Sequence, residues 1–496
     1  MLSRSRIPSL LALNSALGEL ARGARPHQAI SLYNRSRCEG FFPDNYTLPL
    51  VLKASGRLSF LRKGEELHCT SFRLGFESDV FVQNSLISMY SACGDPGTAR
   101  RVFDSVPESV RDVVTWNSMI SAYVQSGLPR GALAVYGKMR VKPDKITSVT
   151  ALSACGKVGD ADAGRKIHAS VVVQGVGLDS FLGSSLIGMY ARCGLVEDAR
   201  RLFDRSLDKN VVCWTSMVSG YTQSGRFREA IKLFREMQVC DVKANEAIVV
   251  CVISACAHLG ALDQGKCVHT YCEINGIEMG NNVNNALIDL YSKCGDLDRA
   301  MSIFHGLVHR DVFSWTVMIC GLAMNGNSEE ALNLFSEMRS LSEVRPNEVT
   351  FLGVLSACSH AGLVDTGYYY FDCMKRTYKL MPKIEQYGCM VDLLGRANLL
   401  MEAMEFIRMM PIKADVVIWR SLLFACQMHN VELAEYATSW ILELEPRKCG
   451  VHVLLSNVYA SASRWGDVKK GQKGNERSWD WKATRLHLDR NKWHCA

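Results

Sequence analysis

The sequence predicts an all-α fold in which helix-turn-helix hairpins stack into an α-solenoid. One stretch of eighteen residues is written almost identically three times, about a hundred residues apart. The copies are LISMYSACGDPGTARRVF (86–103), LIGMYARCGLVEDARRLF (186–203) and LIDLYSKCGDLDRAMSIF (287–304). A fixed period indicates a repeat architecture, because each repeat buries its apolar face only against its neighbours.

Each long period divides into units of 31 to 36 residues. One period contains VVTWNSMISAYVQSGLPRGALAVYGKM (113–139), VTALSACGKVGDADAGRKIHASVVVQG (149–175) and SSLIGMYARCGLVEDARRLFD (184–204). Every unit has an apolar stripe at i, i+3, i+4 and i+7, then a break containing Gly, then a second stripe. This spacing predicts two helices in each unit.

The first copy shows how we expect the elements to form. Its apolar faces are Leu86, Ile87 and Tyr90 in the first helix, and Ala99, Val102 and Phe103 in the second. Gly94 is expected to end the first helix in the left-handed conformation, which costs Gly little. The equivalent glycines are Gly127, Gly194, Gly225, Gly295 and Gly326. Small residues at the place of Ala99 permit close helix packing; they are Ala199, Ala230, Ala300 and Ala331.

Composition limits the class of protein. With 496 residues and 48% hydrophobic content the chain can bury a large core, and a net charge of +7 permits a polyanionic partner without proving one. No run of eighteen apolar residues predicts a membrane span. Many of the nineteen cysteines recur at equivalent places, such as Cys93 and Cys193, or Cys155 and Cys256. We expect them to be packed thiols in a reducing compartment.

The unit from Val113 to Asp144 begins with VVTWNSMI and ends with VKPD, and it resembles the plant pentatricopeptide repeat. The alternation of three unit types resembles the PLS subclass of that family. The resemblance covers roughly residues 10 to 470 and implies twelve hairpins (10–415) in a right-handed superhelix, followed by an E-type extension (416–470). The implied P-type units are 10–44, 113–144, 211–245 and 312–347. The L-type units are 45–79, 145–179, 246–280 and 348–383. The S-type units are 80–112, 180–210, 281–311 and 384–415.

In that family a residue near the start of the first helix and the last residue of the unit together select one RNA base. We call them the selector and the last residue. The resemblance places the seven pairs at Asn14 with Asp44, Asn84 with Asp112, Asn117 with Asp144, Ser184 with Asn210, Thr215 with Asn245, Asn285 with Asp311, and Thr316 with Asn347. Amides and hydroxyls offer donors and acceptors to a base edge, and Asp only accepts. A neighbouring aliphatic residue such as Val114 or Val212 could sandwich the base.

The family's code assigns a pyrimidine to Asn with Asp, and adenine to Ser or Thr with Asn. The L-type units have Pro49, Val149, Val250 and Leu352 at the selector position and imply no preference. Gly388 leaves the last S-type unit unassigned. The implied target is therefore YnYYnAAnYAnn, read 5′ to 3′. A competing interpretation is that these polar residues are N-caps, which hairpin starts require without any RNA.

No catalytic site is expected in the chain. A cytidine deaminase needs a zinc-bound water held in an H-x-E and P-C-x-x-C arrangement, and neither element occurs. His27, His68, His168 and His269 recur within repeat text and are expected at helix surfaces or contacts instead of at a metal. We therefore expect no enzyme activity, cofactor or metal, and a deaminase supplied in trans.

The leading hypothesis is an adaptor that binds single-stranded organellar RNA and marks cytidines for C-to-U editing, with a deaminase-bearing factor or accessory protein as partner and no membrane or small-molecule substrate. Alternatives are a splicing, stability or translation factor, and a tetratricopeptide-like protein-binding scaffold. A mitochondrion is favoured over a chloroplast. Residues 1–9 fit the start of a targeting sequence or an ordinary basic N-terminus. After Lys470 the resemblance stops, and residues 471–496 suggest a frameshift or a real truncation.

Overall fold

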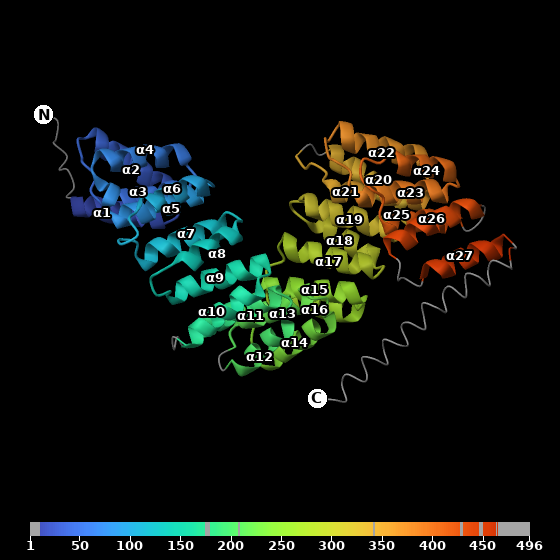
Figure 1. Ribbon diagram of the computed structural model, residues 1–496, viewed down its shortest axis with the longest axis horizontal. Helices are drawn as coiled ribbons and strands as arrows, with labels where there is room; N and C mark the ends of the chain where they lie inside the picture. Colours follow the sequence, from blue (N-terminus) through green and yellow to red (C-terminus); the bar gives the residue numbers. More distant parts are fainter. Residues whose placement is uncertain are drawn as a thin grey trace. The chain divides into compact units, whose positions relative to one another are not determined.

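The computed structural model describes residues 10–173, 179–206, 209–340, 343–426, 430–445, 450–462 and 464. Within these ranges the chain forms 27 α-helices, one short 3-10 helix and no strand (Figure 1). The predicted all-α solenoid of stacked hairpins is therefore confirmed. The expectations for residues 1–9 and for the tail after Lys470 lie outside the described residues. No helix among the described residues is long and apolar enough to cross a bilayer.

The chain divides into an N-terminal unit, residues 1–252, and a C-terminal unit, residues 253–496. The first helices of the N-terminal hairpins are α1 (Leu10–Arg22), α3 (Thr47–Arg57), α5 (Val80–Ala92), α7 (Val113–Gln125), α9 (Lys145–Val158), α11 (Ser180–Arg192) and α13 (Val211–Gln223). The second helices are α2 (Pro26–Cys38), α4 (Leu61–Arg73), α6 (Pro96–Ser105), α8 (Pro129–Lys138), α10 (Ala161–Val173), α12 (Val196–Arg205) and α14 (Phe227–Val239). The 3-10 helix η1 (Phe76–Ser78) follows α4, and α15 (Glu246–Leu259) contains the boundary between the units.

The C-terminal unit continues the alternation of first and second helices. Its second helices are α16 (Leu262–Ile274), α18 (Leu297–Gly306), α20 (Ser328–Ser340), α22 (Val364–Arg376), α24 (Leu400–Arg408) and α26 (Val431–Leu444). The first helices are α17 (Asn281–Lys293), α19 (Val312–Met324), α21 (Glu348–Ala361), α23 (Ile384–Arg396) and α25 (Val416–Ala425), followed by α27 (Gly450–Ser461).

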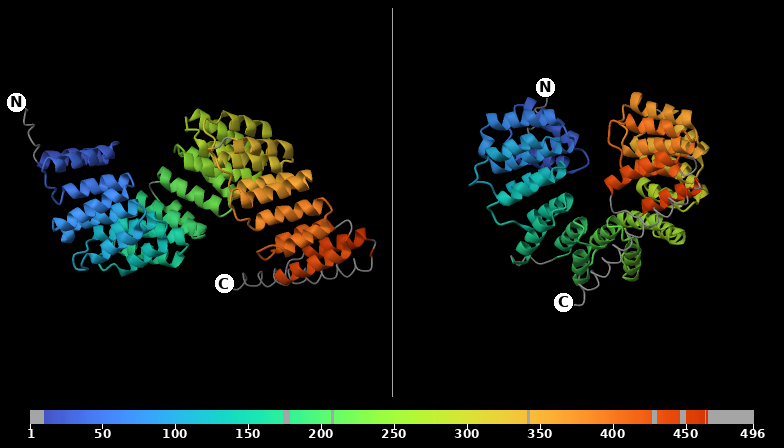
Figure 2. Two further views of the ribbon diagram at one scale, coloured as in Figure 1. Left: turned by 90° about the horizontal axis from the view of Figure 1, so that it is seen from above. Right: turned by 45° about the vertical axis from the view of Figure 1, so that its right-hand side comes forward.

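Within each unit a first helix packs on its own second helix and on the next first helix, and each second helix also packs on the following first helix (Figure 2). The six apolar residues predicted for the first hairpin contact are all buried, and the five predicted small residues are fully buried. Gly94 has φ of 81°, and the other five predicted glycines are also left-handed. The first helices therefore form one continuous layer in each unit.

One recurring contact joins the second helix of a hairpin predicted to be S-type to the next first helix. Phe203 meets Trp214 edge to face with ring centroids 4.8 Å apart, and Phe103–Trp116 and Phe304–Trp315 repeat this contact at 5.1 and 5.0 Å. A cation covers the Phe ring each time; the cations are Lys209, Arg111 and Arg310. Aromatic pairs of this kind add to the apolar area that they bury.

A second recurring contact joins a predicted L-type hairpin to the predicted S-type hairpin after it. The Nδ1 atoms of His68, His168 and His269 each lie 2.9 Å from a Tyr hydroxyl. The partners are Tyr90, Tyr190 and Tyr291. The expectation that these histidines make helix contacts is confirmed. No group of His, Cys, Asp and Glu among the described residues could hold a metal ion.

The cysteines of the described residues are free thiols. Cys155, Cys256 and Cys358 are buried, while the thiols at the place of Cys93 are partly exposed. Burial raises the pKa of Cys155 and of Cys358 to about 12, so both stay protonated and inert. The prediction that the cysteines serve packing is confirmed for these positions.

Replacing Phe203 with Ala removes one ring from a junction, and we expect a loss of about 3–5 kcal/mol in the free energy of unfolding. Urea unfolding followed by tryptophan fluorescence measures it. Val239→Ala is the control, because Val239 is 87% exposed and should change stability by less than about 0.5 kcal/mol. Equal losses in the two variants would contradict the proposed role of the ring.

The three His–Tyr contacts predict a pH dependence of stability. Burial lowers the pKa of His68, His168 and His269, and Glu273 partly offsets this at His269. The unfolded chain therefore binds protons more readily, so the stability is complete above the ordinary pKa of 6.5 and decreases as the pH falls below it.

The thermal midpoint of the wild type should fall between about pH 7.5 and about pH 5.5. In a triple His→Gln variant, whose amides can still bond the Tyr hydroxyls, the midpoint should fall less over the same interval. Parallel pH profiles for the two proteins would refute this prediction.

Candidate functional site

The seven selectors lie at the fifth residue of seven first helices. These helices are α1, α5, α7, α11 and α13 in the N-terminal unit, and α17 and α19 in the C-terminal unit. Five of the seven side chains are partly exposed, whereas Ser184 and Thr316 are 4% and 6% exposed. A fifth residue is a full turn inside its helix, so the N-cap interpretation does not account for the selectors.

Six of the seven last residues, in contrast, are caps of the next first helix. The carboxylate or amide oxygens of Asp112, Asp144, Asn210, Asp311 and Asn347 accept a hydrogen bond from the second or third backbone N–H of that helix. Asn245 accepts an equivalent bond from the N–H of Ile248. Asp44 lies two residues before Tyr46, the N-cap of α3, and accepts a bond from the N–H of Thr47, the first residue of that helix. Each selector pair thus spans two hairpins, and its geometry depends on how they stack.

Four pairs are joined by direct hydrogen bonds, one of them between the Asn285 amide and the Asp311 carboxylate. Asn14 Nδ2 donates to the Asp44 carboxylate at 3.3 and 3.4 Å, and Asn117 Nδ2 donates to Asp144 at 3.2 and 3.3 Å. Asn245 Nδ2 donates to the Thr215 hydroxyl at 3.2 Å. These pairs are held together before any ligand binds, which lowers the entropy cost of binding.

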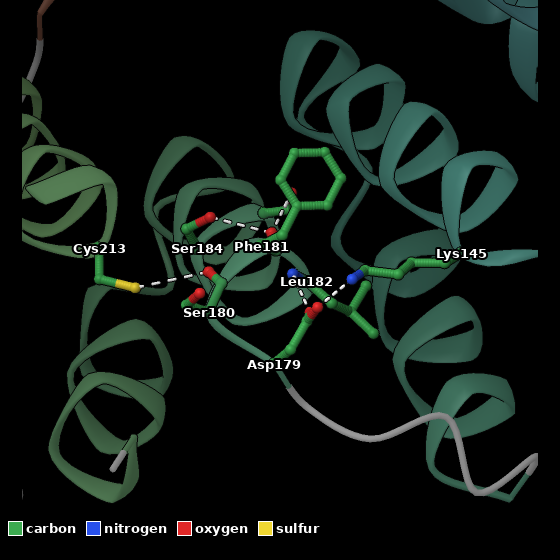
Figure 3. A network of polar contacts seen from close by, with 8 residues as sticks. Lys145, Asp179, Ser180, Phe181, Leu182, Ser184 and Cys213 are labelled. Carbon is green, nitrogen blue, oxygen red and sulfur yellow. Dashed lines mark hydrogen bonds and ion pairs between the residues drawn. The ribbon is translucent and has the colours of Figure 1, made fainter. Parts of the chain in front are cut away.

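The remaining pairs differ from this arrangement. Thr316 shares a 2.7 Å hydrogen bond with Thr350, whose hydroxyl donates to Asn347, so the pair is linked through a third residue. Ser184 donates to the carbonyl oxygen of Phe181 within its own helix at 2.9 Å (Figure 3). Its low exposure makes Ser184 the least accessible of the seven selectors.

Three selector asparagines have an amide oxygen that is buried and has no hydrogen-bond partner among the described residues. They are Asn84, Asn117 and Asn285. A buried acceptor without a partner is costly and calls for an explanation. The same oxygen recurs at the same place in three repeats, and an incoming donor can reach it once the amide turns toward the surface.

Hydrogen bonds keep three of the last-residue aspartates ionised. Burial acts to raise the pKa of Asp44, Asp144 and Asp311, but the bonds from the capped residue and from the selector amide outweigh it, and each pKa lies below its ordinary value. These carboxylates therefore accept hydrogen bonds and cannot donate them at neutral pH.

An apolar side chain is exposed at the second position of many first helices. Val114 and Val212, predicted to flank a base, are 57% and 50% exposed. The same position is exposed and apolar elsewhere, at Phe81, Ile146, Phe181, Phe313, Val349 and Val417. Aromatic and aliphatic side chains of this kind can stack on bases.

Around Asn84 these features line one cavity of about 700 Å³. Its walls include Phe81, Val114, Asn84, Asp112 and, from earlier hairpins, the basic side chains of Arg22 and Lys53. A volume of this size suits a small planar group.

In three of the hairpins predicted to be L-type the last residue is held differently. Asn45 donates to Asp79 at 2.9 Å, and Lys145–Asp179 and Lys383–Glu348 are ion pairs between the first and the last residue of a unit. Figure 3 shows Lys145 directed at Asp179, which also accepts the N–H of Leu182. The apolar selector position takes no part, so these last residues are tied to another partner.

A row of basic residues at the ends of first helices was not predicted from the repeat pattern. Arg22, Arg57, Lys157, Arg192, Lys293 and Arg396 lie in the last turns of first helices. Each follows a selector position by eight residues, which places it on the same helix face. That spacing is visible in the sequence once the helix starts are known.

This arrangement defines an α-solenoid whose first helices present one short polar pair at many hairpin junctions. Seven segments match the PPR repeat, at residues 84–109, 114–143, 184–211, 212–242, 285–312, 349–377 and 387–413. Residues 310–360 match the PPR repeat family, and residues 428–475 match the E motif.

The chain belongs to the pentatricopeptide repeat family. It is 41% identical over 466 residues to the pentatricopeptide repeat-containing protein At4g38010 of Arabidopsis thaliana, covering 93% of this chain and 83% of the relative. It is 38% identical to the chloroplastic At1g08070 and 35% identical to the mitochondrial At2g22410 of the same plant, covering 93% and 94% of this chain and 67% and 74% of those relatives.

The fold is also that of a solved member of the family. The maize protein PPR10 superposes with a TM-score of 0.53 at 16% identity, covering 95% of this chain and 80% of PPR10. Its complex with an 18-nucleotide psaJ RNA element gives 0.51 at 19% identity, covering 95% and 69%.

Substitution of Asp144 tests its structural role as the N-cap of α9. Asp144→Ala removes the cap of α9 and should cost about 1 kcal/mol of unfolding free energy, whereas Asp144→Asn should cost a few tenths because Asn also caps well. Urea unfolding tests this, with Asp104→Ala, an exposed ion-pair carboxylate, as the control. Equal effects of Ala and Asn would show that the cap is not important.

Proposed function

We propose that this chain is a sequence-specific adaptor for single-stranded organellar RNA, and that it selects cytidines for C-to-U editing by a deaminase supplied in trans. The observation that carries the proposal is the repeated unpartnered amide oxygen of Asn84, Asn117 and Asn285, each beside an aspartate one hairpin further on. A base edge supplies the missing donor, and an exposed apolar residue at the second helix position supplies a stacking surface.

Membership of the family supports RNA as the ligand, as does the solved complex of maize PPR10 with RNA. Recognition is spread over many junctions, with each base worth about 1–3 kcal/mol. The seven selector pairs remain a prediction, and with them the target YnYYnAAnYAnn. The buried Ser184 must change its rotamer or act through Asn210 to contribute its adenine.

Two features support the editing class. One is the match of residues 428–475 to the E motif. The other is that the first helix is one residue longer in every third hairpin. The first helices α9, α15 and α21, in predicted L-type units, have 14 residues, and those of predicted P- and S-type units have 13. The first helix of the remaining predicted L-type unit, α3, is shorter. It begins at Thr47, two residues after the start of its unit, and contains Pro49.

The role proposed for the chain is to bind and position RNA, without a catalytic step of its own. The edited cytidine then lies four nucleotides beyond the base under the last S-type unit, as the family rule places it. Relatives include mitochondrial and chloroplastic proteins, and we propose the mitochondrion, with the chloroplast as the alternative.

Changing the two central adenines of the target to cytidine should weaken binding in a gel shift by at least about 30-fold, since two contacts of about 1–3 kcal/mol are lost. The double variant Thr215→Asn, Asn245→Asp makes that pair identical to Asn117 with Asp144. It should restore tight binding to RNA in which only the second adenine is a pyrimidine.

A target with a changed base at an n position is the control and should bind as before. Equal binding of the original and the adenine-substituted RNA would refute base selection. Binding of peptides but not of single-stranded RNA would favour a protein-binding scaffold. A knockout with unchanged editing and altered transcript ends or splicing would favour the other RNA-processing roles.

A further inference from the structure

The residues four and eight positions after a selector position lie on the same helix face as the selector, one and two turns further along. We call these three positions the selector face of a first helix. In the N-terminal unit the face has five basic side chains at the two later positions, and no acidic one. They are Arg22, Lys53, Arg57, Lys157 and Arg192.

Within the part of the chain that the structure describes, none of these five side chains forms an ion pair, so their positive charge is not cancelled. Arg57 donates to the carbonyl oxygens of Ala21 and Gly23, and Lys157 donates to that of Val124, which are neutral partners. All five residues are exposed. Glu19 lines a cavity with Arg22, but it lies one residue off the selector face.

The selector face of the C-terminal unit has a different charge pattern. From α17 to α23 its basic residues apart from His360 are Lys293 and Arg396. An aspartate lies four residues before each of them, one helical turn earlier. Lys293 Nζ lies 2.8 Å from Asp289 Oδ2, and Arg396 Nε lies 2.8 Å from Asp392 Oδ2. The hydroxyl of Ser359, on the preceding first helix, holds Asp392 at 2.6 Å. The ring of His360 is bonded to the Ala323 carbonyl oxygen.

The formal charge at these positions is therefore +5 in the N-terminal unit and zero in the C-terminal one, where two cations meet two aspartates. The cavity around Asn84 shows how the unpaired cations meet the selectors, since Arg22 and Lys53 line it together with Asn84 and Asp112. A base in this cavity brings its phosphate near both cations.

We propose that binding of RNA phosphates is concentrated in the N-terminal unit, and that Asp289 and Asp392 neutralise the two cations that would bind phosphate in the C-terminal unit. The ligand is the phosphodiester backbone of single-stranded RNA. The N-terminal unit anchors the strand by charge, and the C-terminal unit reads bases with little attraction for RNA in general. This inference rests on the proposed function.

The salt dependence of binding to the YnYYnAAnYAnn RNA tests the proposal. For single strands the slope of log K against log salt changes by about 0.7 for each phosphate contact. With the full chain, the triple variant Lys53→Gln, Lys157→Gln, Arg192→Gln should reduce the slope by about 2. Lys293→Gln with Arg396→Gln should leave it unchanged.

Releasing the two paired cations should have the opposite effect. The double variant Asp289→Asn, Asp392→Asn should steepen the slope by up to about 1.4 and tighten binding several-fold at low salt. Exposed pairs one turn apart add little to stability, so the variant should stay folded, as circular dichroism can verify.

A matched control has the same change in net charge. Asp104→Asn with Asp204→Asn opens two Arg–Asp pairs of the same spacing on the second helices α6 and α12, away from the selector face. Its slope should equal that of the wild type. If the Asp289, Asp392 variant behaves like this control, or if the Lys293, Arg396 variant loses slope, the inference is wrong.

The two hypotheses fail in distinguishable ways. If the wild type binds the target and its adenine-substituted form equally, the proposed function fails, and this inference fails with it. If the wild type discriminates between them and the N-terminal triple variant keeps the full slope, only the inference about phosphate binding fails.

Discussion

The structure depends on one constraint, that no hairpin can bury its two apolar stripes alone. Each first helix must therefore pack on the next, and the triplicated eighteen residues are the places where this packing is fixed from both sides. Their Tyr, at positions such as 190, bonds the His of the hairpin before, and their Phe, as at 203, meets the Trp of the hairpin after. A stretch that serves two junctions at once tolerates little change.

The candidate site uses the same junctions. The last residue of a unit caps the next first helix and also faces the selector of the hairpin before it, as Asp144 does with Thr147 and Asn117. Capping needs a short side chain with an acceptor, and so does the recognition of a base edge. One carboxylate oxygen of Asp144 meets both needs. The orientation of the selector pair and the stability of the stacked hairpins therefore depend on the same contact.

Differences among hairpins follow from what holds the last residue. Where a selector amide or hydroxyl is hydrogen-bonded to the last residue, as at Asn14 and Thr215, the two side chains form a polar pair between neighbouring first helices. Where the first residue of the unit holds it, as Lys145 holds Asp179, the selector position is apolar. The chain thus alternates hairpins that have a polar selector pair with hairpins whose selector position is apolar, while the charges on the same layer differ between the two units.

The sequence by itself determined the period, the two helices of each unit, the glycine stops and the buried positions around residues such as Tyr90 and Phe103, because these follow from local spacing and from backbone freedom at Gly. It also placed the fourteen polar residues in the repeat. Only tertiary structure decided that Thr316 reaches Asn347 through Thr350, and that Ser359 of the preceding first helix holds Asp392. Those outcomes depend on the distances between side chains of neighbouring helices, and helical periodicity does not specify such distances.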